Sequence, residues 1–177
     1  SDRHTLEHRY KHERACSTAA FMPRGGKLRG KTVTLELGSH TDAGPSTYRF
    51  RTRDGLHSTG EFRGETLLAL DACWEHDLGE LLVVQANYGV LGIVLAARAD
   101  SVTMSESSAR AADTCRENVR ENGVDAAVRT VARESELDGS FDTAVYVPKP
   151  YTATEVGKQR LADALGQLGP GGTLFLA

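Results

Sequence analysis

The alternation of apolar and polar positions predicts a regular succession of strands and helices over the second half of the chain. Short apolar runs predict strands over 81–84, 102–104, 127–131, 141–147 and 173–177. The run over 81–84 is continuously apolar, which is typical of a strand covered on both faces. Between the runs, an apolar stretch predicts a helix over 90–98, and amphipathic stretches predict helices over 109–122 and 154–168. This order indicates βαβ units with right-handed crossovers, and hence a doubly wound, mostly parallel sheet in an α/β fold.

The helix over 109–122 has recognisable ends, and two of these helices have a predicted buried side. Ser107 or Ser108 can cap the start of that helix, and Gly123 suits its end because glycine readily adopts the left-handed conformation. The residues expected to face inward are Ala112, Cys115 and Val119 in this helix, and Val156, Leu161, Ala164, Leu165 and Leu168 in the helix over 154–168.

The first part of the chain follows a different pattern. Alternation over 33–37 and 48–51, with a turn-rich loop over 38–45 between them, predicts a β-hairpin. A helix is expected next, and the residues near its buried side are Thr66, Leu67, Leu68, Leu70, Ala72 and Cys73. We therefore divide the chain into a polar basic arm (1–31), a hairpin and helix (32–78) and a Rossmann-like domain (79–177).

The arm over 1–31 carries many charges and little apolar periodicity. It holds the cations Arg3, Arg9, Lys11, Arg14, Arg24, Lys27, Arg29 and Lys31. Such an arm can contact RNA phosphates, or it can be a loose terminus. His4, His8 and His12 would share one face of a helix, but no carboxylate or Cys completes a ligand set, so we predict no metal site.

Composition narrows the classes of partner. The chain of 177 residues is 40% hydrophobic and 25% charged with a net charge of −3, so binding to nucleic acid requires a local basic face. No apolar run reaches the roughly 20 residues that span a bilayer, and the charged N-terminal segment shows no apolar signal-peptide region, so we expect no membrane partner. The three cysteines are far apart, which favours a reducing, cytoplasmic setting.

The turn after the strand over 81–84 is the natural ligand site. In a doubly wound sheet, ligands bind outside the carboxyl ends of the strands, and the Gly-containing turn over 85–89 lies at such an end. Glu106 ends the next strand about 20 residues later, where an acid can accept hydrogen bonds from a ribose diol. The alternative is that Glu106 is a helix-terminal charge favoured by the helix dipole.

Three segments resemble class I S-adenosylmethionine (SAM)-dependent methyltransferases. LVVQANYGVLGIVLA (82–96) resembles the family's LDLGCGYGVLGI, and VTMSESSARAADTCRENVRENG (102–123) resembles VTMVDINPRAVELARRNAERNG. Residues 55–58 and 60–70 resemble PGVFSRGGLDPGTRLLLE, a segment of rRNA guanine-N2 methyltransferases in the "methyltransferase small" group. The resemblance covers residues 48–177 and implies a SAM-dependent enzyme that methylates a nucleic-acid base, guanine N2 of rRNA.

The resemblance also implies roles for particular residues. The cofactor would be lined by Gln85, Ala86, Asn87 and Gly89, with Glu106 on the ribose hydroxyls and Glu134 near the adenine amine. In the family, the sequence NPPF after the fourth strand grips the target amine, so that catalysis is mainly positioning. The matching residues here imply Pro148 and Tyr151 as the catalytic pair, with Tyr151 stacking on the base.

The chain departs from the family pattern at several points. Val147 replaces the Asn of NPPF, Lys149 replaces its second Pro, and Pro148 and Pro150 are equally compatible with a rigid loop. The first motif lacks its usual acid and first Gly, around Gln85 and Ala86.

A further departure is length. The family sheet has seven strands and this chain is predicted to have the first five, so the sequence is either a fragment of a longer protein or a domain that lacks the last two strands. Its fifth strand would be an exposed edge that the N-terminal hairpin or a second chain could cover, as a homo- or hetero-oligomer. The alternative to an enzyme is a non-catalytic methyltransferase-like module that binds RNA or protein.

Overall fold

A parallel five-stranded sheet forms the centre of the molecule. The computed structural model describes residues 8–13, 30–37, 47–57 and 62–177. The strands of this sheet are β4 (Glu80–Val84), β5 (Ser101–Glu106), β6 (Ala127–Thr130), β7 (Phe141–Tyr146) and β8 (Leu168–Leu176). Their order is β6-β5-β4-β7-β8, and every neighbouring pair is parallel, so the predicted doubly wound α/β fold is confirmed.

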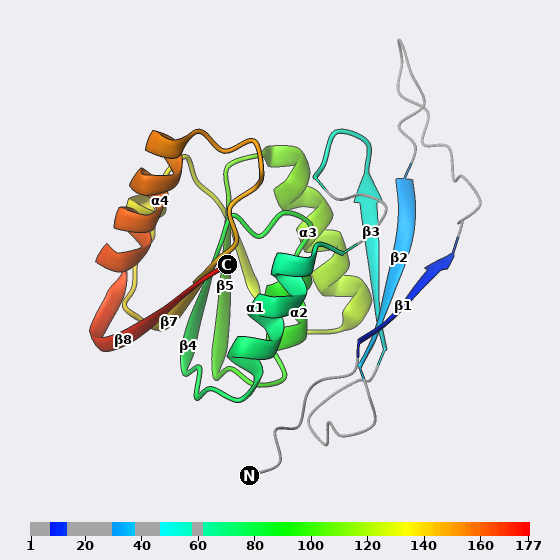
Figure 1. Ribbon diagram of the computed structural model, residues 1–177, viewed down its shortest axis with the longest axis horizontal. Helices are drawn as coiled ribbons and strands as arrows, with labels where there is room; N and C mark the ends of the chain where they lie inside the picture. Colours follow the sequence, from blue (N-terminus) through cyan, green and yellow to red (C-terminus); the bar gives the residue numbers. More distant parts are fainter. Residues whose placement is uncertain (1–7, 14–29, 38–46, 58–61) are drawn as a thin grey trace.

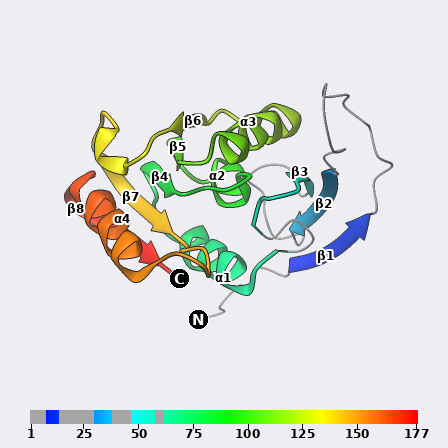
Figure 2. The same ribbon diagram turned by 90° about the horizontal axis from the view of Figure 1, so that it is seen from above.

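Helices cover both faces of this sheet (Figures 1 and 2). They are α1 (Gly64–Trp74), α2 (Val90–Leu95), α3 (Ala109–Asn122) and α4 (Thr154–Gly166), with a short 3-10 turn, η1 (Glu134–Glu136). Alternate residues of β4 point to opposite faces: Leu81 and Val83 belong to the larger core, which includes α2 and α3, whereas Leu82 belongs to the smaller core beside α4. Burial of β4 on both faces explains its continuously apolar sequence.

The ends of α3 follow the sequence prediction closely. The Ser108 side chain accepts a hydrogen bond from the backbone N–H of Ala111, and Gly123 ends the helix with a φ of 64°. Helix α2 is shorter than predicted and ends at Leu95, because Ala96–Arg98 turn the chain back toward β5.

A second, antiparallel sheet is formed by the N-terminal segments. Its strands are β1 (His8–Glu13), β2 (Gly30–Leu37) and β3 (Thr47–Arg53), in the order β1-β2-β3. The pairing of β2 with β3 confirms the predicted hairpin, although its loop over 38–45 lies outside the described residues. Strand β1 lies within the predicted arm, so His8 and His12 lie on a strand and the expected helical face is wrong for them. His4 lies outside the described residues.

Two asparagines of α3 join this sheet to the rest of the molecule. Asn118 accepts a hydrogen bond from the backbone N–H of Arg51 (2.7 Å) and donates one to the carbonyl of Arg51 (3.0 Å). One helical turn later, Asn122 makes the same pair of bonds with Arg49 (3.1 and 2.8 Å). Residues four apart share a helix face, and alternate residues of a strand present their backbone groups to the same side, so the two amides pair with the free edge of β3.

Two of the predicted buried faces are only partly correct. In α1, Leu68 and Ala72 are exposed, because the helix packs through Ala69, Leu70, Cys73 and Trp74. In α4, Ala164 is buried as predicted, but Val156 and Leu165 are exposed. The apolar pattern could not identify these faces, because apolar residues lie all around α1, and the inner side of α4 carries Arg160 and Asp163, each in an ion pair, beside Ala164.

The predicted cover for strand β8 is not the N-terminal sheet. Figures 1 and 2 show that β1–β3 lie beside α3, at the other side of the molecule from β8. Helix α1 contacts β8 instead, and the ring of His76, just after α1, meets Phe175 of β8 edge-on at 5.2 Å. The described parts of the chain contain no helix with the length and apolar character needed to cross a membrane.

Candidate functional site

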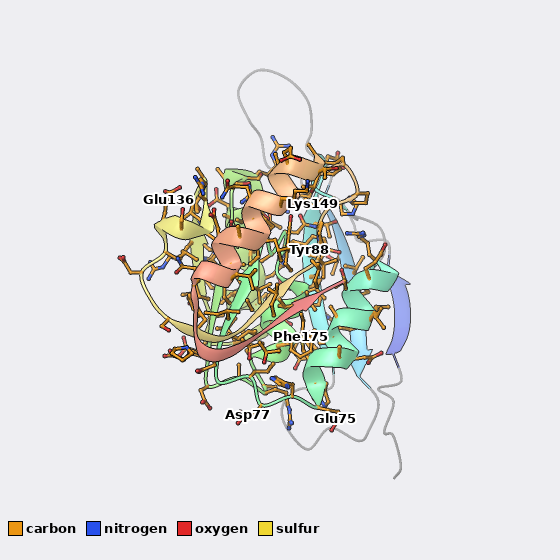
Figure 3. All side chains as sticks on the ribbon, turned by 60° about the vertical axis from the view of Figure 1, so that its left-hand side comes forward. Glu75, Asp77, Tyr88, Glu136, Lys149 and Phe175 are labelled. Carbon is orange, nitrogen blue, oxygen red and sulfur yellow. The ribbon has the colours of Figure 1, made fainter. Side chains whose placement is uncertain are left out.

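The predicted site residues meet at one edge of the parallel sheet. The turn over 85–89 follows β4, Glu106 is the last residue of β5, and residues 147–151 follow β7. Because β4, β5 and β7 are parallel neighbours, their carboxyl ends lie side by side. Figure 3 shows Tyr88 of the turn and Lys149 of the β7 segment between α1 and α4.

The turn after β4 adopts a left-handed backbone three times. The φ angles are 54° at Gln85, 55° at Asn87 and 103° at Gly89. When the segment is aligned position by position with LDLGCGYGVLGI, Gln85 and Asn87 align with glycines of that motif, and Val83 aligns with its aspartate. Asn tolerates this conformation, whereas it is uncommon for Gln.

Glu106 is fully buried and points toward this turn, as the sequence predicted. Its Oε2 accepts a hydrogen bond from the backbone N–H of Asn87 at 2.8 Å. Its Oε1 accepts bonds from the backbone N–H groups of Ser107 (2.9 Å) and Ser108 (3.1 Å). The carboxylate is therefore held rigidly where the β4 turn meets the end of β5.

Lys149 forms an ion pair with this buried acid. Its Nζ lies 3.3 Å from Oε2 and 3.4 Å from Oε1 of Glu106, and its side chain is 16% exposed. The sequence identified Lys149 only as a departure from the family pattern. Only the tertiary structure could pair it with a residue 43 positions earlier.

Glu134 is the second fully buried acid of the site, and its partners come from three elements. It accepts hydrogen bonds from the amide of Gln85 (2.9 Å) and from the hydroxyl of Ser105 (3.0 Å). Arg160 of α4 donates to both oxygens of Glu134 at 3.1 Å and to the Ser107 hydroxyl at 3.2 Å. Arg160 was not predicted from the sequence, because nothing in the helix pattern indicated that this charge points inward.

An ion pair outside the site holds η1 in place. Arg133, just before η1, donates to both oxygens of Asp163 in α4 at 3.0 and 2.7 Å. Hydrogen bonding to Arg133 is the main cause that lowers the pKa of Asp163 below its usual value of 3.8. The pair therefore fixes the position of Glu134, the first residue of η1.

We expect Asp163→Asn to destabilise the protein in a pH-dependent way. A lowered carboxyl pKa stabilises the folded state above the usual value, and this contribution is lost as the pH falls through the folded-state pKa. The variant should therefore melt a few degrees below wild type at pH 7, and the difference should shrink below pH 3.8. Thermal unfolding followed by circular dichroism tests this, with the exposed Asp113→Asn as control. A gap that is independent of pH would contradict it.

Two cavities lie on either side of the Lys149 side chain. The first, about 50 Å³, lies toward α1, and the second, about 280 Å³, lies toward α4. Lys149 and Gln85 line both. The first cavity is also lined by His57, Arg63, Thr66, Ala86, Asn87 and Val147, and the second by Ser107, Tyr146, Tyr151, Val156 and Arg160. His57, Arg63 and Thr66 lie in the resembling segments 55–58 and 60–70, but they were not predicted as site residues, because the resemblance implied no role for those segments.

Two polar atoms in the first cavity lack partners. His57 Nε2 and Asn87 Oδ1 are buried and have no hydrogen-bond partner within the described part of the chain. Burial, then the charges of Arg63 and Lys149, lower the pKa of His57 below 6.5, which favours the neutral ring at pH 7. Both atoms are available to bind a ligand, because a buried polar group without a partner is otherwise costly.

The segment after β7 combines a fixed backbone with an exposed ring. The Pro148 carbonyl accepts a hydrogen bond from Arg63 at 3.0 Å. The Tyr151 side chain is 71% exposed, and its ring meets His57 edge-on at 5.7 Å. An exposed aromatic ring beside a cavity is suited to stacking on a base.

Comparison with known proteins identifies the family. The family model of the methyltransferase small domain matches residues 47–177, and the chain belongs to this family of SAM-dependent methyltransferases. Ribosomal RNA small subunit methyltransferase C of Enterobacter sp. (strain 638) is 31% identical over 129 residues. That match covers 70% of this chain and 36% of the relative, so the chain spans about a third of the length of the relative.

Solved structures share the fold. A T. thermophilus 16S rRNA N2 methyltransferase (RsmC), in complex with AdoMet and guanosine, superposes with a TM-score of 0.67 and 24% identity. This match covers 87% of the present chain and 47% of that one. A ribosomal protein L11 methylase from Lactobacillus delbrueckii subsp. bulgaricus gives a TM-score of 0.54 at 21% identity, over 63% of this chain and 56% of that one.

The groups present at the site fit the family's cofactor. Glu106 offers a buried acceptor for ribose hydroxyls, and Asn87 Oδ1 offers an acceptor without a partner among the described residues. Lys149 is the exception, because its ammonium group already forms an ion pair with Glu106.

Proposed function

We propose that this protein transfers a methyl group from SAM to the exocyclic amine of a base in RNA, with guanine N2 of rRNA as the target. The observation that carries the proposal is the buried Glu106 carboxylate, which is hydrogen-bonded to the turn that follows β4. The rRNA methyltransferases among the similar proteins support an RNA substrate, and the location that goes with it is the cytoplasm.

The residues that would hold SAM come from the ends of three strands. The turn residues Gln85, Ala86, Asn87 and Gly89 would lie along the cofactor, and Glu106 would accept hydrogen bonds from its ribose. Glu134 would face the adenine if Gln85 or Arg160 gives up its hydrogen bond to one of the Glu134 carboxylate oxygens. When bound, SAM supplies a methyl group on a sulfonium that is already activated toward attack.

The protein's remaining task is to position the target amine. Tyr151 would stack on the base, and the carbonyl of Pro148 would lie near the amine. The Val147 side chain carries no acceptor, whereas His57 Nε2 in the same cavity has no hydrogen-bond partner among the described residues. His57 would therefore accept a hydrogen bond from the amine.

A second candidate function is a non-catalytic module that binds RNA or protein. The ion pair between Lys149 and Glu106 favours this candidate, because it satisfies the acid without any ligand. The absence of a side-chain acceptor at Val147 favours it as well.

Binding and methyl transfer together test the proposal. Wild type should bind SAM by titration calorimetry and transfer tritiated methyl groups to unmodified rRNA. Glu106→Gln should weaken SAM binding about tenfold or more, because a charged hydrogen-bond acceptor is lost. Tyr151→Ala should keep the SAM affinity and lose most of the transfer. Glu155→Gln, at an exposed position on α4, is the matched control.

The outcomes separate the two candidates. SAM binding with no transfer to any RNA would favour the non-catalytic module. Wild type that binds no SAM, or Glu106→Gln that binds it as wild type does, would reject the enzyme.

A further inference from the structure

We propose that Lys149 is a specificity-determining residue that lowers the affinity of the site for SAM relative to its demethylated product, S-adenosylhomocysteine. The inference rests on the proposed function and concerns the charge of the ligand. SAM carries a sulfonium cation, whereas the product carries an uncharged thioether in the same place.

The hydrogen-bonding capacity of Glu106 is already filled when Lys149 is in place. A carboxylate offers about four acceptor positions. Three are used by the backbone N–H groups of Asn87, Ser107 and Ser108, and Lys149 lies within 3.4 Å of both oxygens. Lys149 occupies the one remaining position, so a ribose hydroxyl can reach Glu106 only if Lys149 moves away.

Lys149 also separates two spaces that a large ligand needs as one. The cavity of about 50 Å³ toward α1 is much smaller than the roughly 300–1,000 Å³ of ordinary ligand pockets. Lys149 and Gln85 stand between it and the cavity of about 280 Å³ toward α4. Displacing the Lys149 side chain from Glu106 therefore also opens the site.

The charges that line these two cavities have one sign. Of their described residues, Arg63, Lys149 and Arg160 are cationic, and none is a carboxylate. Arg63 is paired with Glu65 at 3.2 Å, and Arg160 with Glu134. The charge of Glu106 is likewise balanced by Lys149.

The balance of charge changes when a ligand enters. With Lys149 present, its positive charge balances the negative charge of Glu106, so the pair does not attract a sulfonium. The ammonium group also stays near the site after a ligand displaces it, because the Lys149 side chain is attached there. Without Lys149, the buried carboxylate carries an uncompensated negative charge, which attracts a cation and leaves a thioether unaffected. Both ligands gain when Lys149 is removed, but the cationic ligand gains more.

The test compares the two ligands in the full chain by titration calorimetry. Lys149→Met keeps the length of the side chain and removes its charge, and Lys149→Gln is a second neutral variant. Both should bind SAM and S-adenosylhomocysteine more tightly than wild type, with a gain about tenfold larger for SAM. Lys149→Arg keeps the charge and should keep the wild-type ratio of affinities. Lys158→Met, at an exposed ion pair on α4, is the matched control and should match wild type.

Each outcome decides the question. Suppose that the ratio of the two affinities stays at the wild-type value in both neutral variants while circular dichroism shows a native fold. That result would overturn the role proposed for Lys149 and leave the proposed function standing. Binding of neither ligand by wild type or by any variant would reject the proposed function, and this inference with it. SAM binding by wild type that tightens in the neutral variants by a larger factor than the binding of S-adenosylhomocysteine would support the inference.

Discussion

Gly89→Ala is expected to lower the free energy of unfolding by about 3 kcal/mol and to abolish SAM binding. Gly89 has a φ of 103°, which is strained for any residue with a Cβ atom. An added Cβ would also lie 2.8 Å from Cys115 Sγ and 3.0 Å from Ile93 Cδ1. The strained φ angle and the close Cβ contacts both destabilise the variant. A backbone movement that relieved the strain would push the turn against α2. Urea unfolding measures the change in stability, and calorimetry measures the loss of binding.

The matched control is a glycine with ample space. A Cβ atom added at Gly166, the last residue of α4, would meet no heavy atom of the described residues within 4 Å. Gly166→Ala should therefore unfold at the same or a slightly higher urea concentration, because alanine favours the helix. Wild-type stability in Gly89→Ala would show that the turn adjusts freely, and its proposed role in shaping the site would fail.

Asn118→Ala is expected to lower the free energy of unfolding by about 3 kcal/mol. Asn118 is fully buried and makes hydrogen bonds with the N–H and carbonyl groups of Arg51 and with the carbonyl of Tyr88 (2.8 Å). Its removal leaves these backbone groups without this partner, and the cost of a buried unsatisfied group is about 1–3 kcal/mol. Because Tyr88 lies in the turn after β4, we expect weaker SAM binding as well.

The control for this variant is a charged neighbour on the same helix. Glu121 of α3 forms an ion pair with the half-exposed Arg51 at 2.8 Å. Surface ion pairs contribute about 0–1 kcal/mol, so Glu121→Ala should change the stability little. Equal losses in the two variants would mean that general packing of α3 on β3 outweighs the Asn118 hydrogen bonds.

Local patterns located the strands and main helices of the parallel domain, but α4 ends at Gly166 and β8 begins at Leu168, which was expected on the buried side of the helix. The continuous apolar run of β4 reflects burial on both faces, and Ser108 and Gly123 mark the ends of α3 because caps depend on adjacent residues. The alternation of strands and helices then restricted the topology, since parallel strands need right-handed crossovers. The same reasoning placed Glu106 beside the β4 turn.

The pattern was less informative where a face depends on distant partners. Leu68 and Val156 were expected inside and are exposed, because apolar positions surround α1, charged residues lie on the inner side of α4, and only the neighbouring elements decide which side is buried. Strand β1 was missed within a charged segment, because its pairing with β2 is made across a long stretch of chain.

The sequence by itself determined the class of fold, the strand ends that form the site and the acid at the end of β5, since each depends on neighbouring residues and on the rule that parallel strands end together. The tertiary structure alone decided how the charges pair. Lys149 with Glu106, Arg160 with Glu134 and Asn118 with the edge of β3 join residues 26 to 67 positions apart. Such contacts depend on the packing of complete elements, and no periodicity or motif in one sequence encodes them locally.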